Sequence, residues 1–421
     1  MSDKFLAVSI FAIVYIYIIF SKRSKSIVIW SGILILLLLK VINISDSLSF
    51  INWNVLGIFA GTLVLAEFFI YSRVPVLIAD HLINNSKTVG GAFLWICVMT
   101  SLLSAFIENV ATVLIIAPIA LVCSKKLNVS PVPFIIGIAI SSNLQGTATL
   151  IGDPPSMILA SYEKMNFNDF FWYHGKPGIF FAVQLGAVFS FFVLYLFFKK
   201  FRQPSLKMEP EAVISWIPTY MICGLIVVLA GAPVLHIEFE WFGLICMAFG
   251  LLGVIWGVFA DRSETWRAIK EYDWDTTFFL AGIFVMVGLL QHISAIDDLK
   301  NILISLTGES VFGSYTLIVW MSIAFSAFID NVPYITAMIP VAHSMGEALT
   351  GSPYLMVFGL LIGSCLGGNI TPIGASANIV GVGLLRKEGY RITFWDFIKI
   401  GLPFTLAATA AAYVFIWFVW S

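Results

Sequence analysis

Charge is scarce in this sequence of 421 residues: only 11% of them are Asp, Glu, Lys or Arg, whereas 60% are hydrophobic. A soluble domain carries roughly 25% charged residues, so this composition predicts a polytopic integral membrane protein. The net charge of −1 gives no information about partners, because the placement of charge matters in a membrane protein and its sum does not. We expect the lipid bilayer as surroundings and no nucleic-acid partner.

Cysteine is also rare. The five cysteines lie apart in apolar segments, without the spacing of a metal site or of a disulfide framework. No polar stretch is long enough to fold as a separate domain outside the membrane. The sequence therefore predicts no bound cofactor.

Long apolar runs dominate the chain. A helix needs about 20 apolar residues to cross roughly 30 Å of hydrocarbon. Ten predicted crossings lie near 5–20, 27–44, 54–72, 132–160, 178–198, 213–231, 241–260, 274–292, 352–385 and 400–420. Two further apolar stretches, 89–124 and 312–349, are too long for one crossing and are interrupted near the middle, so we predict that each forms a re-entrant hairpin.

The distribution of Lys and Arg predicts the orientation, since cytoplasmic loops are enriched in both. Most of these residues fall on one side only if neither interrupted stretch crosses the membrane. We therefore expect the N- and C-termini outside a prokaryotic plasma membrane and the polar linker, residues 200–212, in the cytoplasm.

The two halves of the chain resemble each other. Glu108-Asn109 interrupts the first long stretch, and Asp330-Asn331 interrupts the second at an offset of 222 residues. Each half has five predicted crossings, an odd number, so the second half is expected to be inverted relative to the first. The prediction is an all-α fold of two inverted repeats, residues 1–199 and 213–421, with the linker between them.

Polar residues at these interruptions are candidates for an ion site. A carboxylate at membrane depth costs several kcal/mol unless it is paired, protonated or hydrated; the alternative for Glu108 and Asp330 is capping of the following helix. A segment rich in Gly, Pro and Asn follows each hairpin and predicts a break within a helix. The predicted substrate- and ion-binding residues are Glu108, Asn109, Thr112, Ser142, Asn143, Gly146, Thr149, Asp153, Asp330, Asn331, Gly368, Asn369, Thr371 and Asn378.

Three more specific assignments follow from the same residue types. Na⁺ is expected at side-chain oxygens of Asn109, Asn331, Thr149 and Thr371. Glu67 lies within an apolar run and is a candidate proton relay, or else bonds to a neighbouring helix. Asp153 either contacts a cation or caps the half-helix that begins at Pro154.

Two motifs carry a resemblance to a known family. Gly146-Thr-Ala-Thr-Leu-Ile-Gly-Asp-Pro-Pro155 and Gly367-Gly-Asn-Ile-Thr-Pro-Ile-Gly-Ala-Ser-Ala-Asn378 resemble the ion transporter superfamily, in its branch of arsenite permeases, NhaD-type Na⁺/H⁺ antiporters and the P protein. The resemblance implies an elevator-type transporter, usually a homodimer. The related divalent anion:sodium symporters carry Ser-Asn-Thr at both hairpin tips, where this sequence has Glu108-Asn109-Val110 and Asp330-Asn331-Val332.

These observations predict an ion-coupled secondary active transporter of a small inorganic ion or small anion, and not an enzyme. Acidic hairpin tips would repel a dicarboxylate, which favours cation/proton antiport of the Na⁺/H⁺ type with Na⁺ or H⁺ as the coupling ion. Arsenite or antimonite efflux and sodium-coupled carboxylate (citrate or dicarboxylate) symport are the alternatives. A channel is disfavoured because no predicted helix carries a polar stripe along its whole length.

Overall fold

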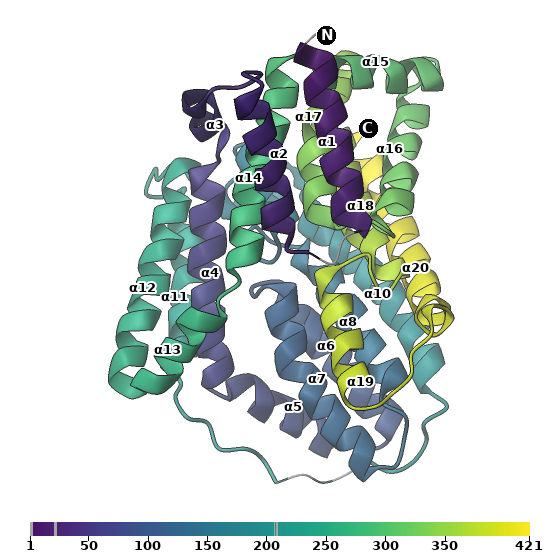
Figure 1. The fold of residues 1–421 in the computed structure, drawn as a ribbon. Helices are drawn as coiled ribbons and strands as arrows, with labels where there is room; N and C mark the ends of the chain where they lie inside the picture. Colours follow the sequence, from purple (N-terminus) through teal and green to yellow (C-terminus); the bar gives the residue numbers. More distant parts are fainter. Residues whose placement is uncertain (1–2, 21–22, 206, 208) are drawn as a thin grey trace.

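The computed structural model describes residues 3–20, 23–205, 207 and 209–421, which are mostly helical (Figure 1). Residues 206 and 208 of the predicted linker lie outside this described part. The first half contains α1 (Asp3–Phe20), α2 (Lys25–Leu38), α3 (Ile44–Phe50), α4 (Trp53–Tyr71), α5 (Val74–Asn85), α6 (Val89–Ser104), α7 (Asn109–Lys126), α8 (Val132–Gly146), α9 (Pro154–Tyr162), the 3₁₀ helix η1 (Phe167–Phe170), the strands β1 (Trp172–Tyr173) and β2 (Lys176–Pro177), and α10 (Ile179–Phe198).

The second half continues without further strands in its described residues. It contains α11 (Ile217–Gly231), η2 (Phe239–Trp241), α12 (Phe242–Ala260), α13 (Arg262–Glu271), α14 (Trp274–His292), α15 (Ala295–Thr307), α16 (Val311–Ser326), α17 (Asn331–Thr350), α18 (Tyr354–Gly367), η3 (Gly368–Ile370), α19 (Ser376–Lys387) and α20 (Phe394–Trp420). The antiparallel pair β1–β2 pairs Trp172 with Pro177 and forms a small turn before α10.

Helix packing follows the same scheme in both halves. Helix α4 packs on α12 while α14 packs on α2, and α6 packs on α8 while α16 packs on α18. Most of the buried apolar side chains, from both halves, form one large core, and a smaller cluster lies beside it. Figure 1 shows the pair α6–α7 in the lower part of the molecule and the pair α16–α17 in the upper part.

Acidic and amide side chains begin four of the helices around the centre. Asn52 and Asp273 accept hydrogen bonds from backbone N–H groups in the first turns of α4 and α14. Glu108 and Asp330 do the same for α7 and α17. Short polar side chains at this position accept from N–H groups that have no partner within the helix. Each acidic-Asn pair therefore marks the turn between two helices.

Two glycines allow the broken helices to approach the hairpins closely. A Cβ atom on Gly152 would lie 2.5 Å from the carbonyl oxygen of Gly146, and one on Gly374 would lie 2.7 Å from that of Gly368. Carbonyl oxygens at the ends of α6 and α16 lie 2.8 to 3.0 Å from the same positions. Only glycine fits there, because any side chain would collide with backbone.

Fewer helices than the ten predicted crossings meet the length and hydropathy expected of a span. Six in the described residues do, or seven if the pair α15–α16, bent by 115°, is counted as one. The predicted spans 132–160 and 352–385 are each divided into two shorter helices, and α2 and α11 have only 14 and 15 residues. Helix α7, predicted as a hairpin arm, is one of the six. The chain is an integral membrane protein. By helix length and hydropathy, the described residues contain fewer crossings than the ten predicted.

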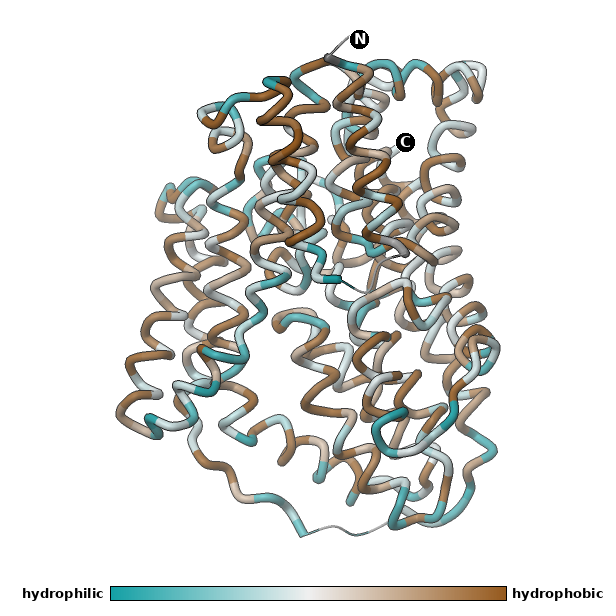
Figure 2. The backbone as a smooth tube through the Cα atoms, viewed as in Figure 1, coloured by the Kyte–Doolittle hydropathy of each residue, from teal (hydrophilic) through white to brown (hydrophobic). Residues whose placement is uncertain are grey.

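The end of α1 and the start of α2, which a short basic connection joins, lie near mid-height of the molecule in Figure 1. The sequence predicts this connection, with its basic residues, as a cytoplasmic loop. In Figure 2, hydrophobic residues dominate the helices, whereas hydrophilic residues gather in the connections, including the start of α2 at this level. The described ends of the chain lie in the upper half of Figure 1, and the described residues between α10 and α11 lie along the bottom.

Candidate functional site

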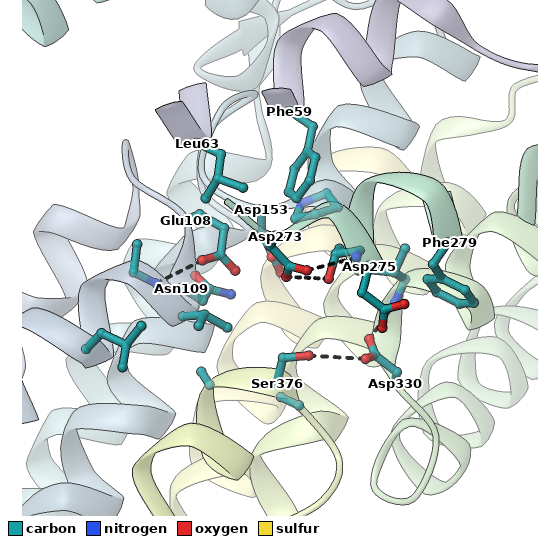
Figure 3. A pocket seen from close by; sticks show the side chains of 18 of the residues that line it. Phe59, Leu63, Glu108, Asn109, Asp153, Asp273, Asp275, Phe279, Asp330 and Ser376 are labelled. Atoms are coloured by element: carbon teal, nitrogen blue, oxygen red, sulfur yellow. Dashed lines mark hydrogen bonds between the residues drawn. The ribbon is translucent and has the colours of Figure 1, made fainter. Parts of the chain in front are cut away.

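A cavity of about 450 Å³ lies where the two acidic turns meet the starts of α2, α9, α14 and α19 (Figure 3). Its walls come from both halves of the chain. It is lined by Lys25, Phe59, Leu63, Glu67, Glu108, Asn109, Val110, Ala111, Leu114, Asn143, Asp153, Pro154, Glu271, Tyr272, Asp273, Trp274, Asp275, Thr276, Phe279, Asp330, Asn331, Val332, Ala375, Ser376 and Ala377.

Acidic side chains dominate this lining. Seven carboxylates face a single ammonium group, that of Lys25. In the view of Figure 3, Glu108 and Asp330 lie on opposite sides of the cavity with Asp153 and Asp273 between them. A cleft lined by one sign of charge concentrates ions of the opposite sign, so the cavity attracts cations.

Asp330 is neutralised by a partner within the protein. The Lys25 ammonium lies 2.5 Å from its Oδ2 atom, and the two side chains are 34% and 15% exposed. The Ser376 hydroxyl donates to the same oxygen at 3.3 Å, and the backbone N–H of Val332 donates to Oδ1. The Asp330 carboxylate therefore has both a counter-charge and hydrogen bonds.

Asp275 holds the start of α2 in place. Its carboxylate accepts hydrogen bonds from the hydroxyls of Ser24 and Ser26 and from the backbone N–H groups of Lys25 and Ser26. A carboxylate with this many donors is fully satisfied. Asp275 thus positions Lys25. Further along α2, the indole N–H of Trp30 donates to the Phe278 carbonyl at 2.9 Å and also holds α2 on α14.

Glu108 and Asp153 have no ion pair among the described residues. The Glu108 carboxylate accepts from the backbone N–H of Ala111 at 2.9 Å, so it caps α7 and also lines the cavity. Asp153 is 4% exposed and accepts from the Asn331 amide at 3.2 Å. It occupies the cap position of α9 without a side-chain cap hydrogen bond. Its second predicted role, capping, is therefore not what its side chain does.

The predicted site residues separate into two groups in the structure. Glu108, Asn109, Asn143, Asp153, Asp330 and Asn331 line the cavity, as does Glu67. The others are buried next to it and hold the backbone: these are Thr112, Ser142, Gly146, Thr149, Gly368, Asn369, Thr371 and Asn378. The binding of substrate or ion by these residues stays a prediction.

The second group fixes the breaks in the helices. Thr149 and Thr371 donate to the carbonyl oxygens of Ala105 and Ala327, just after α6 and α16. The Asn378 amide donates to the carbonyls of Gly368 and Thr371 at 2.8 and 2.9 Å. These bonds satisfy backbone groups that a broken helix leaves without partners.

Four charged lining residues, Lys25, Glu271, Asp273 and Asp275, and the neighbouring Ser376 are absent from the sequence-based prediction. Lys25 follows an apolar run, and a basic residue at such a place indicates a cytoplasmic loop. Asp275 belongs to a Trp-Asp pair that matches Trp53-Asn54 in the first half, a repeat signal that did not by itself indicate a site. The places of Lys25, Asp273 and Asp275 depend on how the start of α14 packs against the start of α2, which no local pattern predicts.

A second cavity of about 370 Å³ lies between the end of α3, with Asn52 just before α4, and the helices α9, α14 and α17. Its lining, among the described residues, includes Asn52, Ser161 and Gln291 but no acidic or basic side chain. The Asn52 amide donates to the Ser161 hydroxyl at 2.5 Å across it. The two cavities therefore differ sharply in charge.

Comparison with known proteins identifies relatives along nearly the whole chain. A family model described as "CitMHS: Citrate transporter" matches residues 15–363. An uncharacterized transporter of Mycobacterium bovis is 32% identical over 429 residues, which cover 98% of this chain and 97% of the relative. The P protein of Mus musculus is 25% identical over 95% of this chain and 58% of that protein, which confirms the predicted resemblance.

Among solved structures, the YdaH transporter of Alcanivorax borkumensis is similar to this chain with a TM-score of 0.56 and 15% sequence identity. The similarity covers 89% of this chain and 86% of that one. At this identity the similarity shows a shared fold. The family model, the mycobacterial relative and the solved structure are all described as transporters and not as enzymes, in agreement with the sequence-based prediction.

Proposed function

The chain belongs to the CitMHS family of citrate transporters, and from that premise we propose that it is a secondary transporter that exchanges a small inorganic cation, Na⁺ in the first instance, for protons. The lining of the central cavity, with seven acidic side chains and one basic side chain, carries this proposal. A free tricarboxylate would be repelled from such a cavity, whereas a cation is drawn into it.

The proposed binding positions are the carboxylates of Glu108 and Asp153 together with the amide oxygens of Asn109 and Asn331. These side chains lie on the cavity wall and have no basic partner among the described residues. Hard cations such as Na⁺ prefer oxygen ligands. A carboxylate that moves through a region of low polarity must also be neutralised first, by a proton or by a bound cation. The carboxylates would carry either a proton or the metal cation in each half of the cycle.

The proposed mechanism is alternating access by an elevator motion of two inverted repeats. It is supported by the repeated packing of α4–α12 and α14–α2, and by the positions of α6–α7 and α16–α17 at opposite ends in Figure 1. The second cavity, bounded by the end of α3 and by α9, α14 and α17, is the proposed route to the other side of the membrane. A homodimer is proposed from the family resemblance; light scattering of the purified protein would measure it.

The proposal is tested with the purified chain in proteoliposomes that contain a pH-sensitive dye. We expect external Na⁺ or Li⁺ to drive proton movement in liposomes with wild-type protein and with Glu240→Gln, an exposed acid outside the cavity. Glu108→Gln should leave folded protein without exchange. Wild-type liposomes that exchange no alkali cation for protons would refute cation/proton antiport.

A second candidate function is symport of a carboxylate, and the family description favours it. The acidic cavity requires that such a substrate enter with cations that mask its charge. The same liposomes separate the candidates: citrate uptake that requires a co-transported cation supports symport, and proton exchange without any carboxylate supports antiport. Arsenite, which is neutral at pH 7, serves as a further substrate in the screen.

A further inference from the structure

The two acidic turns have different electrostatic surroundings, although their sequences match. Asp330 is paired with Lys25 at 2.5 Å, whereas Glu108 has no basic partner among the described residues. The Lys25 ammonium also lies 5.9 Å from the centre of the Phe279 ring, a distance at which a cation is attracted to an aromatic face. The cavity thus contains one cation position that is already filled by a side chain.

We propose that Lys25 is a tethered competitor for the transported cation: its ammonium occupies the Asp330 position, and a cation reaches that position only by displacing it. This inference rests on the proposed function and names the residue that limits how many cations the cavity holds. It follows from the geometry, because a carboxylate oxygen at 2.5 Å from an ammonium has no room for a second cation on the same side.

The ion pair between Lys25 and Asp330 connects α2 to the turn between α16 and α17. Lys25 begins α2, which packs mainly against α14 and α1. Asp330 lies in the turn between α16 and α17. The four hydrogen bonds to Asp275 fix the start of α2 on α14, so Lys25 cannot follow Asp330 if the turn moves. Displacement of Lys25 by a cation would therefore release the α16–α17 turn from α2.

A structural role and a competing role for Lys25 give opposite results. If Lys25 only stabilises the fold, Lys25→Gln lowers the stability of the protein and disturbs the cavity, so cation binding is unchanged or weaker and no cation is added. If Lys25 competes, the same variant binds cations more tightly and holds one more cation per chain, because Asp330 becomes available.

The experiment is equilibrium binding of radioactive Na⁺ to detergent-purified full-length protein at one fixed pH, with thermal unfolding as a check of folding. We expect Lys25→Gln to lower the half-saturating Na⁺ concentration about tenfold and to add one bound Na⁺ per chain. Lys25→Arg, which keeps the positive charge, and Lys300→Gln, which removes the ion pair to Asp297 within α15, should both match wild type.

Two double variants complete the test. Lys25→Gln with Asp330→Asn should lose the additional Na⁺, and the exchanged pair Lys25→Asp with Asp330→Lys should bind as many Na⁺ as wild type even if Lys25→Gln does not fold. Unchanged or weaker binding by Lys25→Gln, or an additional Na⁺ in either double variant, overturns the inference. Absence of Na⁺ binding and exchange in the wild type would instead overturn the proposed function.

Discussion

The side-chain amide of Asn143 donates a hydrogen bond to the side-chain oxygen of Asn369 at 3.0 Å. This bond joins the last turn of α8 to η3 and thus connects the broken helices of the two halves. Asn143 also donates to the Cys365 carbonyl at 2.9 Å and accepts from the Asn109 amide at 3.2 Å. One buried asparagine therefore holds together the α6–α7 turn and both helix breaks.

Replacement of Asn143 by Ala is expected to destabilise the protein. It removes three hydrogen bonds and leaves amide groups of Asn109 and Asn369 buried without these partners; each unsatisfied buried group costs about 1–3 kcal/mol. Thermal unfolding in detergent should show a clear decrease in Tm, with Asn301→Ala on the exposed face of α15 as control. Equal Tm values for the two variants would contradict this account.

Gly374 provides a test of the close approach at the second helix break. A Cβ atom there would lie within 2.9 Å of three carbonyl oxygens, those of Gly368, Ala327 and Ser326. We expect Gly374→Ala to shift the break and to reduce both stability and transport, by about 1–3 kcal/mol in unfolding free energy. Gly383→Ala in α19 is the matched control, because open space surrounds that position.

In Gly383→Ala the expected change has the opposite sign. Alanine stabilises a helix by roughly 0.5–1 kcal/mol relative to glycine. A neutral or positive shift in Tm for Gly383→Ala, together with a loss for Gly374→Ala, would agree with the proposed packing. Comparable losses at both glycines would mean that the substitution itself, and not the contact with the carbonyl oxygens, is responsible.

Glu108→Gln should abolish cation/proton exchange without unfolding the protein. The Gln side chain still offers an oxygen to the N–H of Ala111, so the cap of α7 is kept. It cannot carry a proton or a negative charge, so the cavity loses an acid that has no basic partner among the described residues. Dye quenching in proteoliposomes measures exchange, and circular dichroism checks the helices; normal exchange would remove Glu108 from the mechanism.

Much of this arrangement could be predicted from the sequence because its signals are local. Glu108 and Asp330 each follow an apolar run and precede another, so the turns at these residues could be predicted. Gly, Pro and Asn near Gly152 and Gly374 likewise marked the breaks. The family resemblance rested on the same segments, and the comparisons confirmed it.

The remaining features depend on contacts between distant segments. Lys25 and Asp330 are 305 residues apart, and the chain contains no pattern that pairs them. A basic residue after an apolar run normally indicates a loop, which is why the α1–α2 connection was predicted at the membrane surface. Asp273 and Asp275 look like ordinary helix-start residues, and only the packing of α14 brings them to the cavity.

Glu67 lines the cavity from α4, and its contribution can be separated into charge and proton transfer. Removal of one negative charge near a hydrated cation changes its binding free energy by about 1 kcal/mol, which corresponds to roughly a fivefold change in affinity. We therefore expect Glu67→Gln to raise the Na⁺ concentration for half-maximal exchange about fivefold while the maximal rate is kept. A lower maximal rate at an unchanged half-maximal concentration would instead identify Glu67 as the proton relay, since a relay limits proton transfer and leaves cation binding as it is.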